Sequence, residues 1–297
     1  MIKTILLVTL AMVAFAANSL LCRMALSTTN IDPATFTTIR IVSGAFALIL
    51  LSAWIAHKNK ITTEGITTAS NIGLTSSLKA NASIVGGVSL FIYAVCFSFA
   101  YVSMSTGAGA LLLFGSVQIT MISNGFIKGE RFNWVQWMGF ILAFSGLITL
   151  LLPSATAPTF MSSMLMATAG IAWGVYSIIG KRSSSALLAT TGNFTLASLL
   201  CGVLIVHSLF LSSTATPVSQ SGVLYAIASG VLASAFGYAI WYTALPLIKS
   251  TSAATVQLSV PVLATLMGWA FLEEQITLQI ILASTMTLGG IFFVLRR

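Results

Sequence analysis

Residues suited to binding a small polar solute occur singly inside long apolar stretches of this chain. They are amides, hydroxyls, aromatic rings and one arginine: Asn18, Ser19, Arg40, Tyr93, Phe97, Gln118, Trp173, Tyr176, Tyr238, Trp241 and Gln257. Amide groups in such stretches need partners, because hydrocarbon offers none. One interpretation is a solvated cavity that these side chains line. The other is hydrogen bonding between helices, with the aromatic residues in belts at the membrane interface.

Arg40 is the one charge placed clearly inside an apolar stretch. It follows Pro33 by seven residues, which is about 10 Å along a helix. An arginine at the centre of a membrane helix costs about 2.5 to 3.5 kcal/mol on insertion scales. The functional interpretation is a contact to an anion or carboxylate in a cavity. The structural alternative is a side chain that extends to the interface or pairs with Asp32.

No group of residues typical of catalysis is present. The chain has no glycine-rich phosphate loop and no paired histidines, and its two histidines accompany no Ser or Cys nucleophile. Its three cysteines lie in apolar stretches and match neither a disulfide framework nor a metal motif. We therefore expect a protein that is not an enzyme, with no catalytic residues, no metal and no cofactor.

The acidic residues all fall in loops or at helix ends: Asp32, Glu64, Glu130, Glu273 and Glu274. Carriers driven by protons commonly hold a carboxylate inside the membrane. The sequence therefore favours a uniporter or an exchanger. Arg23 and Lys181 are expected near helix ends as interfacial anchors.

The composition predicts an all-α integral membrane protein. Hydrophobic residues make up 57% of the 297 residues, charged residues 6%, and the mean hydropathy is +1.01. Ten stretches approach the length of about 20 residues that a bilayer requires: 4–26, 33–56, 82–102, 106–127, 134–152, 160–180, 187–211, 222–244, 251–271 and 276–295. The pair Asp32-Pro33 predicts an N-cap and first residue for the second of these helices.

Basic residues set the expected orientation. With the N-terminus inside, 11 of the 13 Lys and Arg residues lie on the cytoplasmic side and none lies in an outer loop. The net charge of +8 therefore reflects topology and does not indicate a nucleic-acid partner. We expect a multi-pass protein of the bacterial inner membrane, with both termini cytoplasmic, present as a monomer or homodimer.

The chain also repeats itself. Residues 100–146 and 244–290 overlay with a shift of 144, which aligns Glu130 with Glu274 and Gly146 with Gly290. With a shift of 158, Phe15 falls on Trp173. A unit of five spans is odd, so the two copies must cross the membrane in opposite senses. We expect ten transmembrane helices in two inverted five-helix repeats, 1–152 and 153–297.

These features together resemble the EamA-type transporters of the drug/metabolite transporter superfamily. The resemblance covers essentially the whole chain and is carried by Arg40, the segments 126–131, 259–264 and 271–274, and the glycines 146, 289 and 290. It implies a ten-helix carrier with a cavity formed by helices one, three, four, six, eight and nine. It also implies the movement of small metabolites, often amino acids, out of the cell.

We therefore expect a secondary transporter that exports small-molecule substrates, with amino acids as the leading class, by alternating access. Two alternatives stay open: an efflux carrier for drugs and toxic compounds, and a membrane scaffold that transports nothing. A passive channel would need a continuous polar stripe along several helices, whereas the polar positions here are isolated.

Overall fold

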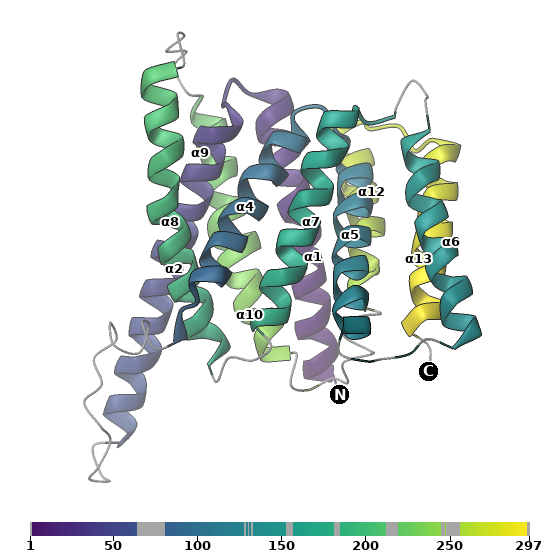
Figure 1. Ribbon diagram of the computed structural model, residues 1–297. Coiled ribbons are helices and arrows are strands. Elements are labelled where there is room, and N and C mark those ends of the chain that lie inside the picture. The colour runs from purple at the N-terminus through teal and green to yellow at the C-terminus, as the bar shows by residue number, and fades with distance from the viewer. Residues whose placement is uncertain are drawn as a thin grey trace.

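The computed structural model describes residues 2–63, 81–127, 129, 131, 133–152, 157–180, 185–211, 219–244, 247 and 256–295, and these residues contain helices and no strands. The helices run up and down side by side (Figure 1). Their bounds are α1 Ile2–Thr28, α2 Pro33–Thr63, α4 Ile84–Tyr101, α5 Thr106–Ile127, α6 Trp134–Leu151, α7 Phe160–Gly180, α8 Ala186–Leu211, α9 Gln220–Ala228, η1 Ser229–Phe236, α10 Gly237–Ala244, α12 Ser259–Leu272 and α13 Leu278–Leu295.

Eight spans are long and apolar enough to cross a membrane: α1, α2, α4, α5, α6, α7, α8 and a composite helix over Gln220–Trp241. The composite helix consists of α9, the π-helical segment η1 and α10, which follow one another without a break. Two further apolar helices, α12 and α13, are shorter. The residues expected to begin the ninth span, 251–255, lie outside the described part of the chain.

Local chemistry explains where several helices begin and end. The Asp32 carboxylate accepts hydrogen bonds from the backbone N–H groups of Ala34 and Thr35, both at 2.9 Å, which confirms the predicted N-cap of α2. Asn133 and Gln136 form a capping box at the start of α6. At the end of α12, Glu273 adopts a left-handed conformation with φ of 55°. This turn directs the next residue, Glu274, back over the helix end.

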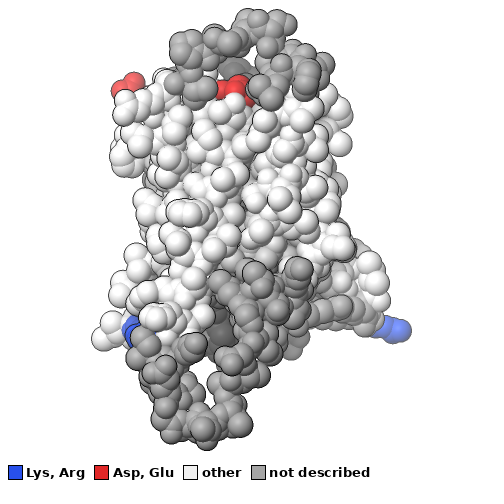
Figure 2. Space-filling model, turned by 90° about the vertical axis from the view of Figure 1, so that its left-hand side faces the viewer, with Lys and Arg blue, Asp and Glu red and all other residues white. Residues whose placement is uncertain are grey.

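Both chain termini lie at one end of the bundle, which we call the terminal end; the opposite end is the distal end (Figure 1). Apart from Arg23 and Arg40, which lie inside the bundle, the described acidic and basic side chains lie at opposite ends, as the red and blue atoms of Figure 2 show. Among the described residues, Asp32, Glu273 and Glu274 lie between helices at the distal end, while Lys3 and Lys58 lie near the terminal end. Large apolar side chains such as Phe46 and Leu199 are exposed on the outside, as a lipid-facing surface requires.

Helices from the two parts of the chain pack against each other in pairs. α2 packs against α8, α5 against α12, and α6 against α13. The α6 and α13 pair stands at one side of the bundle (Figure 1). α1 packs against α10 and α12, and α7 packs against α4 and α5. These contacts place α1, α4, α5, α7, η1 and α10 around a common centre.

The α6 and α13 contact is made through glycine. A Cβ added to Gly146 would overlap Thr287 and Ala283, and one added to Gly290 would overlap Ala143 and Gly139. The shift of 144 turns Gly146 into Gly290, Ala143 into Thr287 and Gly139 into Ala283. The same contact therefore occurs twice, once from each helix, and it requires the close approach that glycine permits.

Candidate functional site

A small cavity lies at the centre of the bundle and encloses about 20 Å³, which is room for about one water molecule. We call it the central cavity. Its lining comes from α1, α4, α5, α7, η1 and α10: Phe15, Asn18, Ser19, Tyr93, Phe97, Leu113, Phe114, Trp173, Ala233 and Tyr238. Six of the sequence-predicted residues are among them. Because so little space remains, a solute needs some of these side chains to move.

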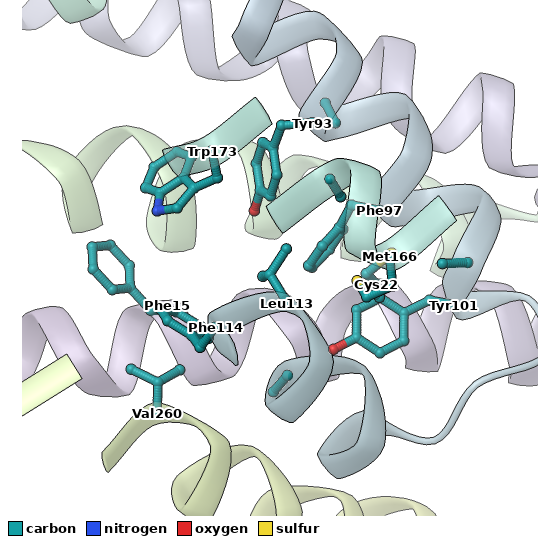
Figure 3. Close-up of a cluster of buried hydrophobic side chains, with 14 of the residues drawn as sticks. Phe15, Cys22, Tyr93, Phe97, Tyr101, Leu113, Phe114, Met166, Trp173 and Val260 are labelled. Carbon is teal, nitrogen blue, oxygen red and sulfur yellow. The ribbon is translucent and has the colours of Figure 1, made fainter. Parts of the chain in front are cut away.

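Aromatic rings fill most of this centre, and the ring of Trp173 lies beside Tyr93 and above Phe15 in Figure 3. Its ring lies 4.9 Å from Tyr93 and 4.9 Å from Tyr238 between centroids, and it stacks on Tyr176 at 5.3 Å. Phe15 meets Trp173 edge-on at 6.5 Å. Offset and edge-on pairs of this kind stabilise a cluster beyond simple burial. The rings form an apolar wall along the central cavity.

Polar groups connect four helices along one side of the cavity. The Tyr93 hydroxyl oxygen accepts two hydrogen bonds, from Asn18 Nδ2 at 3.2 Å and from Arg40 Nη2 at 3.2 Å. The Asn18 carbonyl oxygen in turn accepts a hydrogen bond from Ser229 Oγ at 2.7 Å. These contacts link α1, α2, α4 and η1. Tyr93 is the one member of the chain of contacts that receives two donors.

Arg40 is buried, with 2% of its surface exposed. Its guanidinium carbon lies 5.3 Å from the centroid of Tyr93 and 4.9 Å from that of Phe97, within cation–π range. Nη1 has no hydrogen-bond partner, and within the described residues Arg40 forms no ion pair. The side chain therefore neither extends to the interface nor pairs with Asp32, whose carboxylate caps α2. Both structural alternatives for Arg40 are wrong.

The π-helical segment η1 brings the composite helix close to α2. A Cβ added to Gly230 would overlap the Arg40 carbonyl oxygen and the Ser43 hydroxyl, so only glycine permits this approach. η1 also contributes Ala233 to the cavity lining, and its Ser234 Oγ is buried without a hydrogen-bond partner. π-helical segments occur frequently at functional sites.

Several lining residues were missed in the sequence: Phe15, Leu113, Phe114, Ala233 and, as a partner of Asn18, Ser229. Phe15 aligns with Trp173 under the shift of 158, and this alignment was the available signal. The small residues of η1 gave a weaker signal, because a run of Ser, Gly and Ala is also typical of ordinary helix packing. Leu113 and Phe114 gave none, since they match any apolar helix.

The other sequence-predicted residues lie around the cavity or away from it. Trp241 contacts Phe15 at 6.0 Å between ring centroids, and Tyr176 stacks on Trp173. Gln118 is buried in α5 with Nε2 unpartnered, but it is not part of the lining. Gln257 is half-buried just before the start of α12 and also lies outside the lining. The predicted aromatic residues therefore lie at or beside the cavity, whereas the two predicted glutamines, Gln118 and Gln257, lie outside its lining.

A second polar group of residues ties the helices together at the distal end. Arg23 Nη1 donates to the carbonyl oxygens of Tyr101 at 2.9 Å and Val102 at 2.8 Å, and Nε lies 3.5 Å from Glu274 Oε1. The Glu274 carboxylate accepts hydrogen bonds from the Thr106 N–H at 2.8 Å and the Thr106 hydroxyl at 3.1 Å. We call these five residues the Arg23–Glu274 cluster. It joins α1, α4, the N-terminus of α5 and the loop after α12.

Arg23 and Glu274 both contact other helices, so neither is simply a surface charge at a helix end. The expectation that Arg23 serves as an interfacial anchor is incomplete, because its side chain also closes the space between helix ends. Glu274 satisfies the Thr106 N–H at the start of α5, a backbone donor that has no partner within the helix. A surface hollow at this end reaches Glu273 and Glu274 but none of the cavity residues.

Another hollow, of about 480 Å³, lies toward the terminal end, between α1, α2, α8 and the composite helix. Its lining is apolar except for one threonine: Leu7, Leu51, Ile55, Leu187, Phe236, Ala239, Ile240 and Thr243. Phe236 ends η1, so this hollow and the central cavity share the same helical segment. Among the described residues, no group of His, Cys, Asp and Glu side chains is placed to hold a metal ion.

Known proteins resemble the chain over nearly its full length. An uncharacterized protein of Pseudomonas aeruginosa is 40% identical over 295 residues, which is 99% of this chain and 94% of that protein. An uncharacterized transporter of Archaeoglobus fulgidus is 26% identical over 299 residues, 98% of this chain and 96% of that protein. The uncharacterized transporter YoaV of Bacillus subtilis is 24% identical over 268 residues, 89% and 87% of the two chains.

A crystal structure of a protein with 17% sequence identity superposes on this chain with a TM-score of 0.60 and covers 96% of each chain, which shows a shared fold. The profile of the EamA-like transporter family matches residues 2–152 and residues 160–296. Because these matches span both parts of the chain, the protein belongs to the EamA-like transporter family and is a multi-pass membrane transporter.

Proposed function

We propose that this protein is a secondary transporter that exports small metabolites, with amino acids as the leading class, across the bacterial inner membrane. The central cavity is the observation that carries the proposal. It combines hydrogen-bonding groups of Asn18 and Tyr93 with the aromatic wall around Trp173, the mixture that a site for a small amphipathic solute needs. One chain supplies the described lining, so the proposed site needs no residue from a second copy.

The proposed architecture is ten membrane helices in two inverted repeats, residues 1–152 and 153–297. The reciprocal contact of Gly146 with Thr287 and of Gly290 with Ala143 supports it, because a two-fold relation between halves generates each contact from the other. The pairs α2 with α8 and α5 with α12 occupy matching positions in the two halves and support it as well. In such carriers substrate binds where the repeats meet, near the middle of the membrane.

The proposed mechanism is alternating access, and the contacts at the two ends of the bundle support it. The Arg23–Glu274 cluster closes the distal side by joining four chain segments. The terminal side has the hollow between α1, α2, α8 and the composite helix. We infer that substrate enters the central cavity from the terminal side, and that separation of the Arg23–Glu274 cluster releases it on the distal side.

The proposed orientation has the terminal end in the cytoplasm. The position of Lys3 and Lys58 near the terminal end supports it, because basic residues outside the membrane are retained on the cytoplasmic side. Single cysteines introduced at Lys58 and at Glu273, in a background without the native cysteines, test it by labelling of intact cells with a membrane-impermeant maleimide. We expect labelling at position 273 only. Labelling of both positions, or of position 58 alone, contradicts the orientation.

Amino acids are favoured over cationic drugs because of the charge at the site. The described cavity lining contains no carboxylate to pair with a cation, while the Arg40 guanidinium lies against two of its aromatic rings. A zwitterion offers a carboxylate to this side of the cavity. Transport involves binding and conformational change alone and requires no covalent step.

Two measurements test the proposed function. Overexpression should raise resistance to toxic amino acid analogues, whereas resistance to cationic dyes in place of these analogues would favour multidrug efflux. In proteoliposomes, flux of the amino acid should saturate as its concentration rises. Flux that does not saturate favours a channel, and absence of flux for every solute in the screen favours a scaffold.

A further inference from the structure

The two hydrogen bonds that the Tyr93 hydroxyl accepts leave it able to form one more, as a donor. A phenolic hydroxyl has two lone pairs and one hydrogen, and the lone pairs of Tyr93 face the donors Asn18 Nδ2 and Arg40 Nη2. The hydroxyl hydrogen is then free to donate, and no hydrogen bond donated by it occurs within the described residues. The hydroxyl points into the aromatic cluster between Trp173 and Leu113 (Figure 3). Any group that binds this hydrogen from the cavity must be an acceptor.

The positive charge of Arg40, which donates to the Tyr93 hydroxyl, favours an anion as the acceptor for the Tyr93 hydrogen. Arg40 is 2% exposed, forms no ion pair within the described residues, and keeps Nη1 without a partner. A buried charge without a counter-charge is costly, and the described cavity lining contains no carboxylate that offsets it. A guanidinium that donates to a hydroxyl oxygen also polarises its O–H bond and strengthens it as a donor. The positive side of the cavity is therefore incomplete without a negative ligand.

We propose that Tyr93 and Arg40 form the binding point for the carboxylate of the substrate. Tyr93 donates directly to a carboxylate oxygen, and Arg40 is the positioning residue that holds the Tyr93 hydroxyl and supplies the compensating charge. The aromatic wall of Phe15, Trp173 and Tyr238 receives the apolar part of the substrate. This inference rests on the proposed function and narrows it to carboxylate-bearing solutes with an apolar side chain.

The test compares each acid with its own amide. L-leucine, L-methionine and L-phenylalanine are paired with their carboxamides, which keep the side chain and the ammonium but lack the carboxylate. Binding to the purified full chain is measured by quenching of tryptophan fluorescence, because Trp173 and Trp241 lie at the site. We expect at least one acid to bind about 10- to 100-fold more tightly than its amide, the range for a hydrogen bond to a charged group.

Three variants separate a role in recognition from a role in folding. Tyr93→Phe removes the donor and keeps the ring, and Arg40→Gln removes the charge and keeps a donor to Tyr93. Both should reduce the preference for the acid to about twofold or less, because they weaken binding of the charged carboxylate more than binding of the neutral carboxamide. Arg40→Lys keeps the charge and should retain most of the preference. A merely structural Arg40 would lower the melting temperature and leave the ratio of acid to amide binding unchanged.

The outcomes distinguish this inference from the proposed function. Equal binding of acids and amides, or tighter binding of amides, overturns the carboxylate site while leaving a metabolite transporter intact. Preserved acid preference in both Tyr93→Phe and Arg40→Gln overturns the assignment of these two residues. Failure of every acid and amide to bind contradicts both the inference and amino acids as the substrate class.

Discussion

The two arginines that sit within the bundle have opposite surroundings. Arg23, at the distal end, donates to two carbonyl oxygens and faces the Glu274 carboxylate. Arg40, at the centre, has one hydroxyl and two aromatic rings as partners and leaves Nη1 unpartnered. A charge whose hydrogen-bonding groups all have partners is already stabilised within the protein. A charge with an unpartnered group gains stabilisation when a ligand binds it. The comparison supports the proposal that Arg23 closes the bundle and that Arg40 takes part in binding.

Replacement of each arginine by methionine should separate these roles with the largest effect. Arg40→Met removes a buried charge that has no counter-charge, so we expect amino acid flux to fall about 10- to 100-fold while the melting temperature stays equal or rises. Arg23→Met leaves the Glu274 carboxylate and two carbonyl oxygens with fewer donors, so the melting temperature should fall. Flux into proteoliposomes and thermal unfolding in detergent measure the two effects. A lower melting temperature in Arg40→Met with normal flux per folded protein would reverse the assignment.

The next largest effect concerns opening of the distal end. Cys22 is fully buried beside Arg23 in α1, so its labelling by a membrane-impermeant maleimide reports separation of the cluster. Glu274→Gln weakens the ion pair and the cap on α5, and we expect labelling about 5- to 30-fold faster, since a lost cap costs about 1 to 2 kcal/mol. The background carries Cys96→Ser and Cys201→Ser.

Glu273→Gln is the matched control for that experiment. Its carboxylate is the neighbour of Glu274 in sequence, but the ion pair and the cap on α5 belong to Glu274. Labelling of Cys22 should then stay within twofold of the parent. Equal acceleration in both variants would mean that the charge of the loop, and not the contact with Arg23 and Thr106, controls opening.

A third region tests whether stability and recognition are separable. Gly290→Ala places a methyl group against Ala143 and Gly139 and should destabilise the α6 and α13 pair by about 1 to 3 kcal/mol. Gly289→Ala is the control, because a Cβ at Gly289 meets nothing within 4 Å. Thermal unfolding should distinguish the two variants, while the ratio of acid to amide binding stays at the parent value in both. A changed ratio in Gly290→Ala would show that this helix pair acts on the cavity.

Features determined by neighbouring residues could be predicted from the sequence. The N-cap at Asp32 depends on residues two and three positions away, and the apolar stretches follow from composition. Contacts between distant residues could not be predicted. Glu274 and Thr106 are separated by 168 positions, and the sequence shows only that Glu274 lies at a helix end. The π-helical segment η1 was also missed, because a π-helix depends on packing around it and not on a residue pattern.

The residues of the candidate site also differ in whether the sequence could predict them. Mid-span residues such as Trp173 and Tyr93 were identifiable because each combines a ring with a polar group, and the chain has six Trp and six Tyr against 18 Phe. Gln118 was also predicted, as a mid-span amide, and is buried outside the cavity lining. The direction in which a helix presents each side chain depends on its neighbours, and this information is absent from the residue type. The sequence therefore identifies candidates, and packing selects among them.

The smallest predicted effect concerns the driving force of transport. The described acidic side chains lie at the distal end, in the Arg23–Glu274 cluster and in the neighbouring loops, and the central cavity is lined by none. Carboxylates and histidines are the usual carriers of protons in transporters. Flux of an amino acid down its own gradient in liposomes should therefore change by less than about twofold when an uncoupler collapses the pH gradient, a change of under about 0.4 kcal/mol in the effective barrier. Accumulation driven by an imposed pH gradient would contradict this and place an acidic residue such as Glu274 in the transport pathway. Loss of that coupling in Glu274→Gln, but not in Glu273→Gln, would then identify the Arg23–Glu274 cluster as the site that exchanges the proton, and the paired arginine would take part in the transport cycle as well as in closure.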